Sequence, residues 1–380
     1  MKSWFNLMDE DGWIAREQIL GSEARSKVPP EFQVQYPHYA NPPTLFMILE
    51  AFMDKLRSEE PTPHGDLNRD DPVERLRSAH LENPELGYVY LRSIYPLLKR
   101  QYFWFRKTQW GDVKSYDREA FSTREAYRWR GRSVQHILTS GLDDYPRPQP
   151  PHPGELHVDL ISWMGLMTRS LRRIAEALDE KDDVEELARY ETAITRNIDD
   201  LHWDEKAQTF CDATIDDYEE SVHICHKGYI SIFPFLTGMI GPDSPRLKPI
   251  LDLIADPEEL WSPYGIRSLS KKDEFYGTGE NYWRGPIWMN INYLVLKNLY
   301  VSRTYFSLWA EADLSYFRTL LLLLVPIRNR PDRCIRILGK IWSKMSSESG
   351  RRQDSLGSST TRRRVRASAP STSQAGRAWW

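Results

Sequence analysis

The sequence predicts an all-α protein built from helical hairpins. Apolar side chains between residues 160 and 178 recur at alternating steps of four and three residues, which places one apolar stripe along a helix. No segment alternates apolar and polar residues for long enough to indicate a sheet. Stretches rich in Pro, Gly and Trp separate the periodic segments. No repeat of fixed length is present, which argues against the common solenoids.

Helices are predicted wherever apolar residues follow helical spacing. In chain order these segments are residues 44–58, 86–104, 160–178, 183–199, 226–237, 246–255 and 286–300. Between them lie loops that combine aromatic and charged residues, namely 26–43, 140–154, 257–268 and 275–285. Because functional residues are concentrated in long loops held by a scaffold, these loops are the first places to look for a site.

Charge is distributed unevenly along the chain. The 380 residues carry a formal net charge of −3, but residues 1–350 alone carry −9, since the last thirty hold seven arginines and one aspartate. An acidic body argues against a nucleic-acid partner. We predict a folded domain over residues 1–300, a divergent helical segment over 301–345 and a disordered Ser/Arg-rich tail over 346–380. A basic tail could bind a polyanion, although a solvated tail is the favoured interpretation.

Cysteines, glycine motifs and apolar runs exclude several other classes of site. Cys211, Cys225 and Cys334 cannot all pair with one another, so no disulfide framework is predicted. His223, Cys225 and His226 form H-x-C-H without a distant ligand pair, so no metal site is expected. No phosphate- or dinucleotide-binding glycine motif is present, and no cofactor is expected. Neither a signal peptide nor a membrane-spanning run is predicted.

The stretch SGLDDYPR, residues 140–147, contains two adjacent carboxylates, Asp143 and Asp144. Glycine, aspartate and proline all suit turns, so a solvated turn is one interpretation. The other is that one of the two aspartates is a catalytic acid.

A second group of acidic residues follows closely. Glu155 and Asp159 are four residues apart, which would place both carboxylates on one helix face. The helix dipole explains an acidic residue at Glu155. It explains Asp159 less well, since that residue lies in an apolar stripe near Trp163.

Aromatic residues next to arginine form the third group. Tyr282, Trp283 and Arg284 precede a predicted helix, and Trp129 and Arg130 repeat the combination in AYRWRGR. Such residues suit a sugar ring, but a tightly packed loop is an equally good interpretation. Single-stranded nucleic acid would also suit them, although the acidic body disfavours it. From residues alone, a helical site with carboxylates and aromatic walls fits glycoside hydrolysis.

Six segments, in the same order, resemble the processing α-glucosidases of glycoside hydrolase family 63. They are WIAREQILGSEARSKVPPEF, ANPPTLF, AYRWRGR, SGLDDYPR, ELHVDLISW and GTGENYWRGPIW, and the resemblance as a whole covers about residues 3–300. The resemblance implies an (α/α)6 toroid, here incomplete, and a location in the endoplasmic reticulum. It also implies an inverting reaction that removes the outermost α-1,2-linked glucose from the triglucosylated N-glycan precursor, with that glycan as the partner.

By the same resemblance, Asp143 is the general acid. A negative charge on Asp144 would disfavour ionisation of Asp143 and so keep the acid protonated. The resemblance places the sugar-binding side chains at Trp129, Arg130, Asp144, Glu155, His157, Asp159, Tyr282, Trp283 and Arg284.

The family's general base is a glutamate in a W-E-Q-Y-like context, about two hundred residues after the acid. Here that region reads KIWSKMSSESGRR, so the role is assigned neither to Glu348 nor to Glu280. The family pattern is expected to end near Tyr300 through a frame shift or a retained intron. An upstream β-rich domain, a membrane anchor and the first barrel helices are expected to be missing.

Without a base, an inverting reaction would be slower by orders of magnitude, so the hydrolytic activity of this chain itself is left open. The alternatives are a glycan-binding remnant, another toroidal inverting glycosidase such as a trehalase-like enzyme, and an unfolded product.

Overall fold

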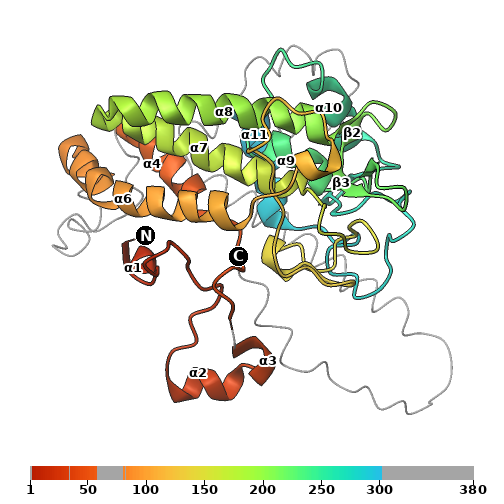
Figure 1. Cartoon of the computed structure of the whole chain (residues 1–380), viewed down its shortest axis with the longest axis horizontal. Coiled ribbons are helices and arrows are strands. Elements are labelled where there is room, and N and C mark those ends of the chain that lie inside the picture. The colour runs from red at the N-terminus through yellow and green to blue at the C-terminus, as the bar shows by residue number, and fades with distance from the viewer. Residues whose placement is uncertain (1, 34, 58–79, 82, 302–380) are drawn as a thin grey trace, which may run out of the picture. The chain divides into compact units, whose positions relative to one another are not determined.

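The computed structural model describes residues 2–33, 35–57, 80–81 and 83–301 (Figure 1). The predicted tail 346–380 and segment 301–345, apart from its first residue, lie outside these ranges. The α-helices are α1 (Lys2–Phe5), α2 (Gly21–Lys27), α3 (Pro30–Gln33), α4 (Leu45–Arg57), α6 (Pro84–Thr108), α7 (Val158–Leu178), α8 (Lys181–His202), α9 (Phe233–Leu236), α10 (Leu247–Ala255) and α11 (Met289–Val301). Short 3-10 helices are η1 (Lys114–Tyr116), η2 (Leu138–Ser140) and η3 (Ile230–Ile232).

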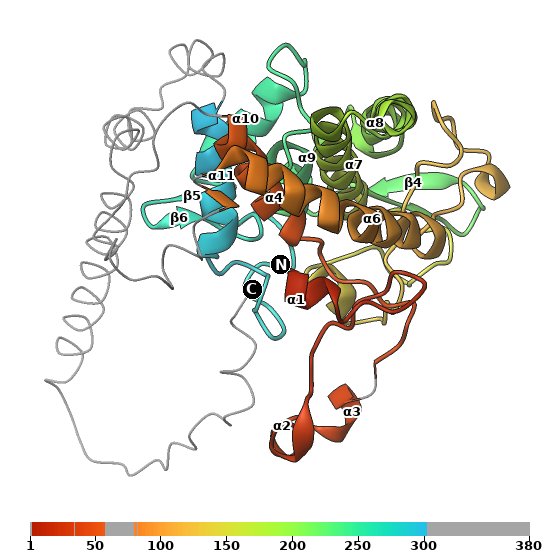
Figure 2. The same cartoon turned by 90° about the vertical axis from the view of Figure 1, so that its left-hand side faces the viewer.

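Helix α7 is the centre of the described fold. It packs against α8, α6, α4 and α9, which explains why most of its side chains are buried. A tight turn at Asp179, whose φ is +60°, reverses the chain into α8. Figure 1 shows the resulting α7–α8 hairpin with α6 beside it, and Figure 2 shows α7 and α8 nearly end-on. The predicted helical hairpin over residues 160–199 is confirmed.

The helix predicted over residues 226–237 is wrong in its first part, because helical structure begins only at Ile230. Before Ile230 the backbone is hydrogen-bonded to another segment of the chain. The Tyr229 N–H donates to the Ser268 carbonyl at 2.9 Å, and Gly228 forms a bridge with Leu269. Apolar spacing alone could not reveal this competing backbone partner.

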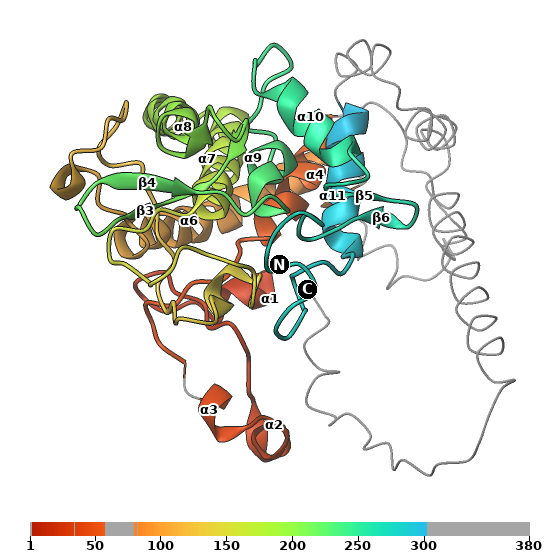
Figure 3. The same cartoon turned by 90° about the vertical axis from the view of Figure 1, so that its right-hand side faces the viewer.

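Within the described ranges, three antiparallel hairpins interrupt the helices, and Figure 3 shows the one formed by β3 and β4. The pairs are β1 (Trp203–Asp204) with β2 (Thr209–Phe210), β3 (Asp212–Ile215) with β4 (Ser221–Ile224), and β5 (Trp261–Ser262) with β6 (Gly265–Ile266). Each strand is two to four residues long, too short to produce a recognisable alternation of apolar and polar residues.

The three cysteines predicted no disulfide framework, but Cys211 and Cys225 are bonded to each other. Cys211 precedes β3 and Cys225 follows β4, so the register Asp212↔Ile224 brings them opposite one another, with Cα atoms 4.7 Å apart. The other two members of H-x-C-H have separate partners. His223 lies 3.2 Å from Asp204, and His226 lies 2.9 Å from Asp273.

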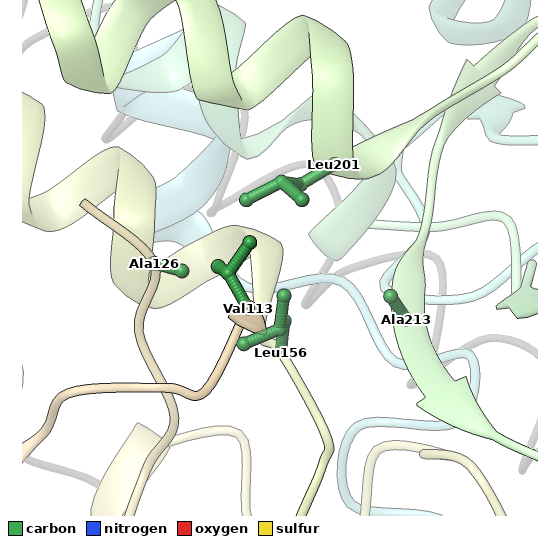
Figure 4. Packing of buried hydrophobic residues seen from close by; sticks show 5 residues of the cluster. All are labelled: Val113, Ala126, Leu156, Leu201 and Ala213. Carbon is green, nitrogen blue, oxygen red and sulfur yellow. The ribbon is translucent and has the colours of Figure 1, made fainter. Parts of the chain in front are cut away.

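A small buried cluster ties the loops around α7 to α8 and β3. Val113, Ala126, Leu156, Leu201 and Ala213 form it, and Figure 4 shows their side chains converging. Leu156 and Ala213 also exchange two backbone hydrogen bonds, of 2.9 and 3.0 Å. This bridge holds the segment before α7 beside β3, and so brings His157 and Val158 close to Asp212.

Acid sensitivity is expected from His202, at the end of α8. Its side chain is buried, Nδ1 donates to the Cys211 carbonyl at 2.9 Å, and among the described residues Nε2 has no partner. Burial lowers its pKa to about 4. In the unfolded chain a histidine has a pKa of about 6.5, so between pH 6.5 and pH 4 the unfolded chain is protonated at His202 while the folded chain is not. The folded state therefore keeps its full stability above pH 6.5 and loses part of it as the pH falls toward 4.

The corresponding loss in the free energy of unfolding is about 3 kcal/mol. It can be measured by urea unfolding at pH 7 and pH 4.5, in the unmodified chain and in His202→Asn. Asparagine keeps an amide donor near the Cys211 carbonyl but does not titrate. We expect a smaller acid-induced loss in the variant, and equal losses would contradict the assignment.

Candidate active site

Asp143 and Asp144 lie in a defined, buried turn. η2 is followed by Gly141, whose φ of +73° favours glycine, and the Tyr145 N–H donates to the Leu142 carbonyl at 3.1 Å. The two aspartates are therefore the central residues of a turn, 6% and 2% exposed. A solvated turn is excluded by this burial.

The N-terminal segment contacts the turn of residues 142–145, the acid turn. Arg16 Nη2 lies 3.8 Å from Asp143 Oδ1, and the Ile137 N–H donates to the Asp143 carbonyl at 2.9 Å. The segment before Arg16 is itself fixed, since the Trp13 indole N–H donates to the Tyr39 carbonyl at 2.9 Å. Sequence reasoning did not single out Arg16, although it lies within the WIAREQ motif.

Arg147, the last residue of SGLDDYPR, is buried between the carboxylates of Asp159 and Asp212. It donates to both oxygens of Asp159, at 3.2 and 2.8 Å, and to Asp212 at 2.8 Å. Burial would lower the pKa of Arg147, but the charges of Asp159 and Asp212 raise it above its usual value. Burial would also raise the pKa of Asp212, and the nearby Arg147 guanidinium holds it below its usual value. This network fixes the acid turn to β3 and to the start of α7.

The prediction that Glu155 and Asp159 share a helix face is wrong. Helix α7 begins only at Val158, whose N–H donates to Asp212 Oδ1 at 3.0 Å. Before it, Leu156 is bridged to Ala213. Glu155 therefore lies in an extended segment, and only Asp159 belongs to the helix.

Glu155 has its own buried network. Arg132 Nε lies 3.1 and 2.9 Å from its two oxygens, and His157 Nε2 lies 3.2 Å from Oε2. The Trp129 N–H donates to His157 Nδ1 at 2.9 Å, so Nε2 carries the proton and donates to Glu155. Burial would raise the pKa of Glu155, but its hydrogen bond with His157 and the charge of Arg132 hold it below its usual value. The carboxylate is thus kept ionised.

The aromatic loop, residues 277–284, and the RWRG segment, residues 128–131, are each bonded to other parts of the chain. The Tyr282 and Trp283 N–H groups donate to the Asp144 carboxylate, and the Trp283 ring stacks on Trp288. Arg130 donates through Nε to the Thr108 carbonyl at 2.9 Å and through Nη2 to the Trp110 carbonyl at 2.6 Å. These contacts place Arg130 against the end of α6.

The structure thus groups the predicted residues into linked networks around one turn. Asp144, Tyr282, Trp283 and Arg284 form one group, and Trp129, Glu155 and His157 form another. Four partners of the predicted residues were missed, namely Arg16 beside Asp143, Arg132 beside Glu155, Arg147 beside Asp159, and Asp212, which shares Arg147. Within the described ranges, no set of three or more His, Cys, Asp or Glu side chains could hold a metal ion. In the same part of the chain, no helix is long and apolar enough to cross a bilayer.

Comparison with solved structures identifies the fold. Family 63 mannosylglycerate hydrolase from Thermus thermophilus, in complex with glucose, is similar with a TM-score of 0.54 and 16% identity. The match covers 86% of this chain and 78% of that chain. The complex of the same enzyme with Tris gives a TM-score of 0.53 at 15% identity, over 78% and 74% of the two chains. The predicted all-α toroidal fold of the (α/α)6 type is confirmed.

Sequence comparisons identify the family. The glycosyl hydrolase family 63 C-terminal domain matches residues 1–355. A probable mannosyl-oligosaccharide glucosidase of Schizosaccharomyces pombe is 54% identical over 79% of this chain, and the mannosyl-oligosaccharide glucosidase of Saccharomyces cerevisiae is 45% identical over 78%. This chain spans 38% of the length of either relative. The extent of the domain match and the level of these identities show that the chain belongs to glycosyl hydrolase family 63.

Proposed function

We propose that this chain carries the acid side of an inverting α-glucosidase site. Its substrate would be the triglucosylated N-glycan precursor, from which it would remove the outermost α-1,2-linked glucose. Family membership and the names of the relatives support a glycosidase that acts on an oligosaccharide. The observation that carries the proposal is the setting of Asp143. The buried turn that contains Asp143 contacts Arg16 and the aromatic loop, and the Arg147 network holds the chain directly after it.

In the proposed reaction, Asp143 gives its proton to the glycosidic oxygen as the bond from that oxygen to C1 breaks. Water attacks C1 from the opposite face, and a second carboxylate, roughly 6.5–9.5 Å from the acid, takes the water's proton. Glu155 and Asp159 are poor candidates for that base, because both are buried in ion pairs with arginines. We propose that they fix the wall of the site. Glu348 lies outside the described residues.

A second candidate function is glycan binding without hydrolysis. The buried ion pairs of Glu155 and Asp159 favour it, since a carboxylate paired with a buried arginine is a poor acceptor for the proton of water. An inverting enzyme without a base loses orders of magnitude in rate.

We place the protein in the lumen of the endoplasmic reticulum. The Cys211–Cys225 disulfide supports this location, because disulfides persist in oxidising compartments and are rare in the cytosol. The relatives' role as mannosyl-oligosaccharide glucosidases agrees with it.

The proposal is tested by incubating the purified full chain with α-1,2-linked diglucose and, separately, with trehalose. Binding is measured by calorimetry and glucose release by a coupled assay. We expect binding and release with the α-1,2-linked sugar only. Release from trehalose alone would favour a trehalase-like enzyme, and binding without release would favour the second candidate function. The absence of both binding and release would overturn both candidate functions.

A further inference from the structure

The two aspartates of the acid turn have different surroundings. Asp143 faces the Arg16 guanidinium at 3.8 Å. Asp144 instead faces the aromatic loop, residues 277–284, and its carboxylate accepts two backbone hydrogen bonds from consecutive residues of that loop. Adjacent carboxylates in one turn therefore contact separate parts of the molecule.

Asp144 uses both of its carboxylate oxygens. Oδ2 accepts the Tyr282 N–H at 3.0 Å, and Oδ1 accepts the Trp283 N–H at 2.7 Å. Arg284 adds a third contact, since its Nε donates to the Asp144 carbonyl at 2.7 Å and lies 3.8 Å from Oδ2. The site is buried, so water cannot readily replace a lost acceptor. Only a carboxylate of this length offers both oxygens.

The loop that Asp144 holds is closed and aromatic. The Gly277 N–H donates to the Arg284 carbonyl at 2.7 Å, which closes the loop at its base. The Trp283 and Trp288 rings stack with centroids 4.0 Å apart and planes within 9°. The Trp288 indole N–H donates to the Tyr282 carbonyl at 3.0 Å. The position of this aromatic group is thus coupled to the backbone that Asp144 anchors.

We propose that Asp144 is a positioning residue, which fixes the aromatic loop at a set distance from the general acid Asp143. Because the two aspartates are neighbours in one turn, the acid and the aromatic group cannot move independently. This role differs from direct contact with the sugar, and it explains why the motif has two carboxylates. Its consequence for catalysis rests on the proposed function, whereas its structural part does not.

The test uses Asp144→Asn in the full chain. Asparagine keeps one acceptor oxygen but turns an NH2 group toward the other N–H donor, so one hydrogen bond is replaced by repulsion. The stacked Trp283–Trp288 pair should give an exciton couplet in the ultraviolet CD spectrum, and Trp288→Phe identifies that signal. We expect Asp144→Asn to lose most of the couplet in the ligand-free protein. A couplet of unchanged size would overturn the proposal.

A matched control is Asp216→Asn, in the turn between β3 and β4. Asp216 Oδ1 also accepts two backbone N–H groups, from Tyr218 and Glu220, both at 2.9 Å. This variant should keep both the couplet and the activity. Should Asp144→Asn lose its helical CD signal, Arg284→Met replaces it, and an unchanged couplet in that variant would also overturn the proposal.

Kinetics on α-1,2-linked diglucose then separates the two aspartates. Asp144→Asn should raise KM and lower kcat/KM by about tenfold or more, because a hydrogen bond to a buried charge is lost. Asp143→Asn should lower kcat and keep the couplet. If Asp144→Asn raised KM with its couplet intact, Asp144 would contact the sugar directly. If the unmodified chain releases no glucose, the proposed function fails, while the couplet still decides the positioning role.

Discussion

Replacing Asp143 by asparagine is expected to reduce glucose release from α-1,2-linked diglucose by about 100-fold or more. The asparagine side chain has the shape of aspartate but cannot supply the proton that the leaving oxygen needs. The fold should persist, because the turn is held by backbone groups, including the Asp143 carbonyl that accepts the Ile137 N–H. The measurement is kcat for glucose release, with helical CD as the check on folding.

Glu280→Gln is the control for this prediction. Glu280 lies in the aromatic loop, its side chain is 59% exposed, and His136 Nε2 lies 3.1 Å from its carboxylate. An exposed ion pair of this kind contributes little free energy to the fold, so activity should stay within about twofold of the unmodified chain. If Asp143→Asn kept its activity, or if Glu280→Gln lost as much, Asp143 would not be the acid.

Arg147→Met is expected to lower the free energy of unfolding by about 3–5 kcal/mol. Methionine fills a similar volume but leaves Asp159 and Asp212 without their shared cation, in a place where both carboxylates are buried. An uncompensated buried charge is costly, and here there would be two. Urea unfolding at pH 7 measures the loss.

Lys248→Met is the matched control. Lys248 pairs with Asp252 four residues along α10, and its side chain is 73% exposed. Loss of this ion pair should lower the free energy of unfolding by about 0.5 kcal/mol or less. A cost for Arg147→Met as small as that of the control would mean that the buried network does not hold the acid turn in place.

The sequence predicted the helices whose packing repeats along the chain. α8 buries one face over several turns, and α7 carries an apolar stripe along its length, so both helices show a clear period in the sequence. It could not predict the strands, which are at most four residues long. The disulfide was missed because an odd number of cysteines says nothing about which two meet. Only the β3–β4 hairpin brings Cys211 opposite Cys225.

The candidate site was predicted in part, through its motifs. Asp143, Asp144 and the aromatic loop were identified, and the structure shows that the last two are in contact. Their partners were missed because they are distant in sequence. Arg147 and Asp212 are 65 residues apart, and Arg132 and Glu155 are 23 apart. Whether the charge of Asp144 keeps Asp143 protonated stays a prediction.

The central claim is that this chain carries an inverting α-glucosidase site. Proton NMR of the glucose first released from α-1,2-linked diglucose tests it most directly, because inversion of an α-linkage yields the β anomer before mutarotation. We predict β-glucose at the earliest time points, with the α anomer appearing only later. A first product in the α configuration would contradict the account.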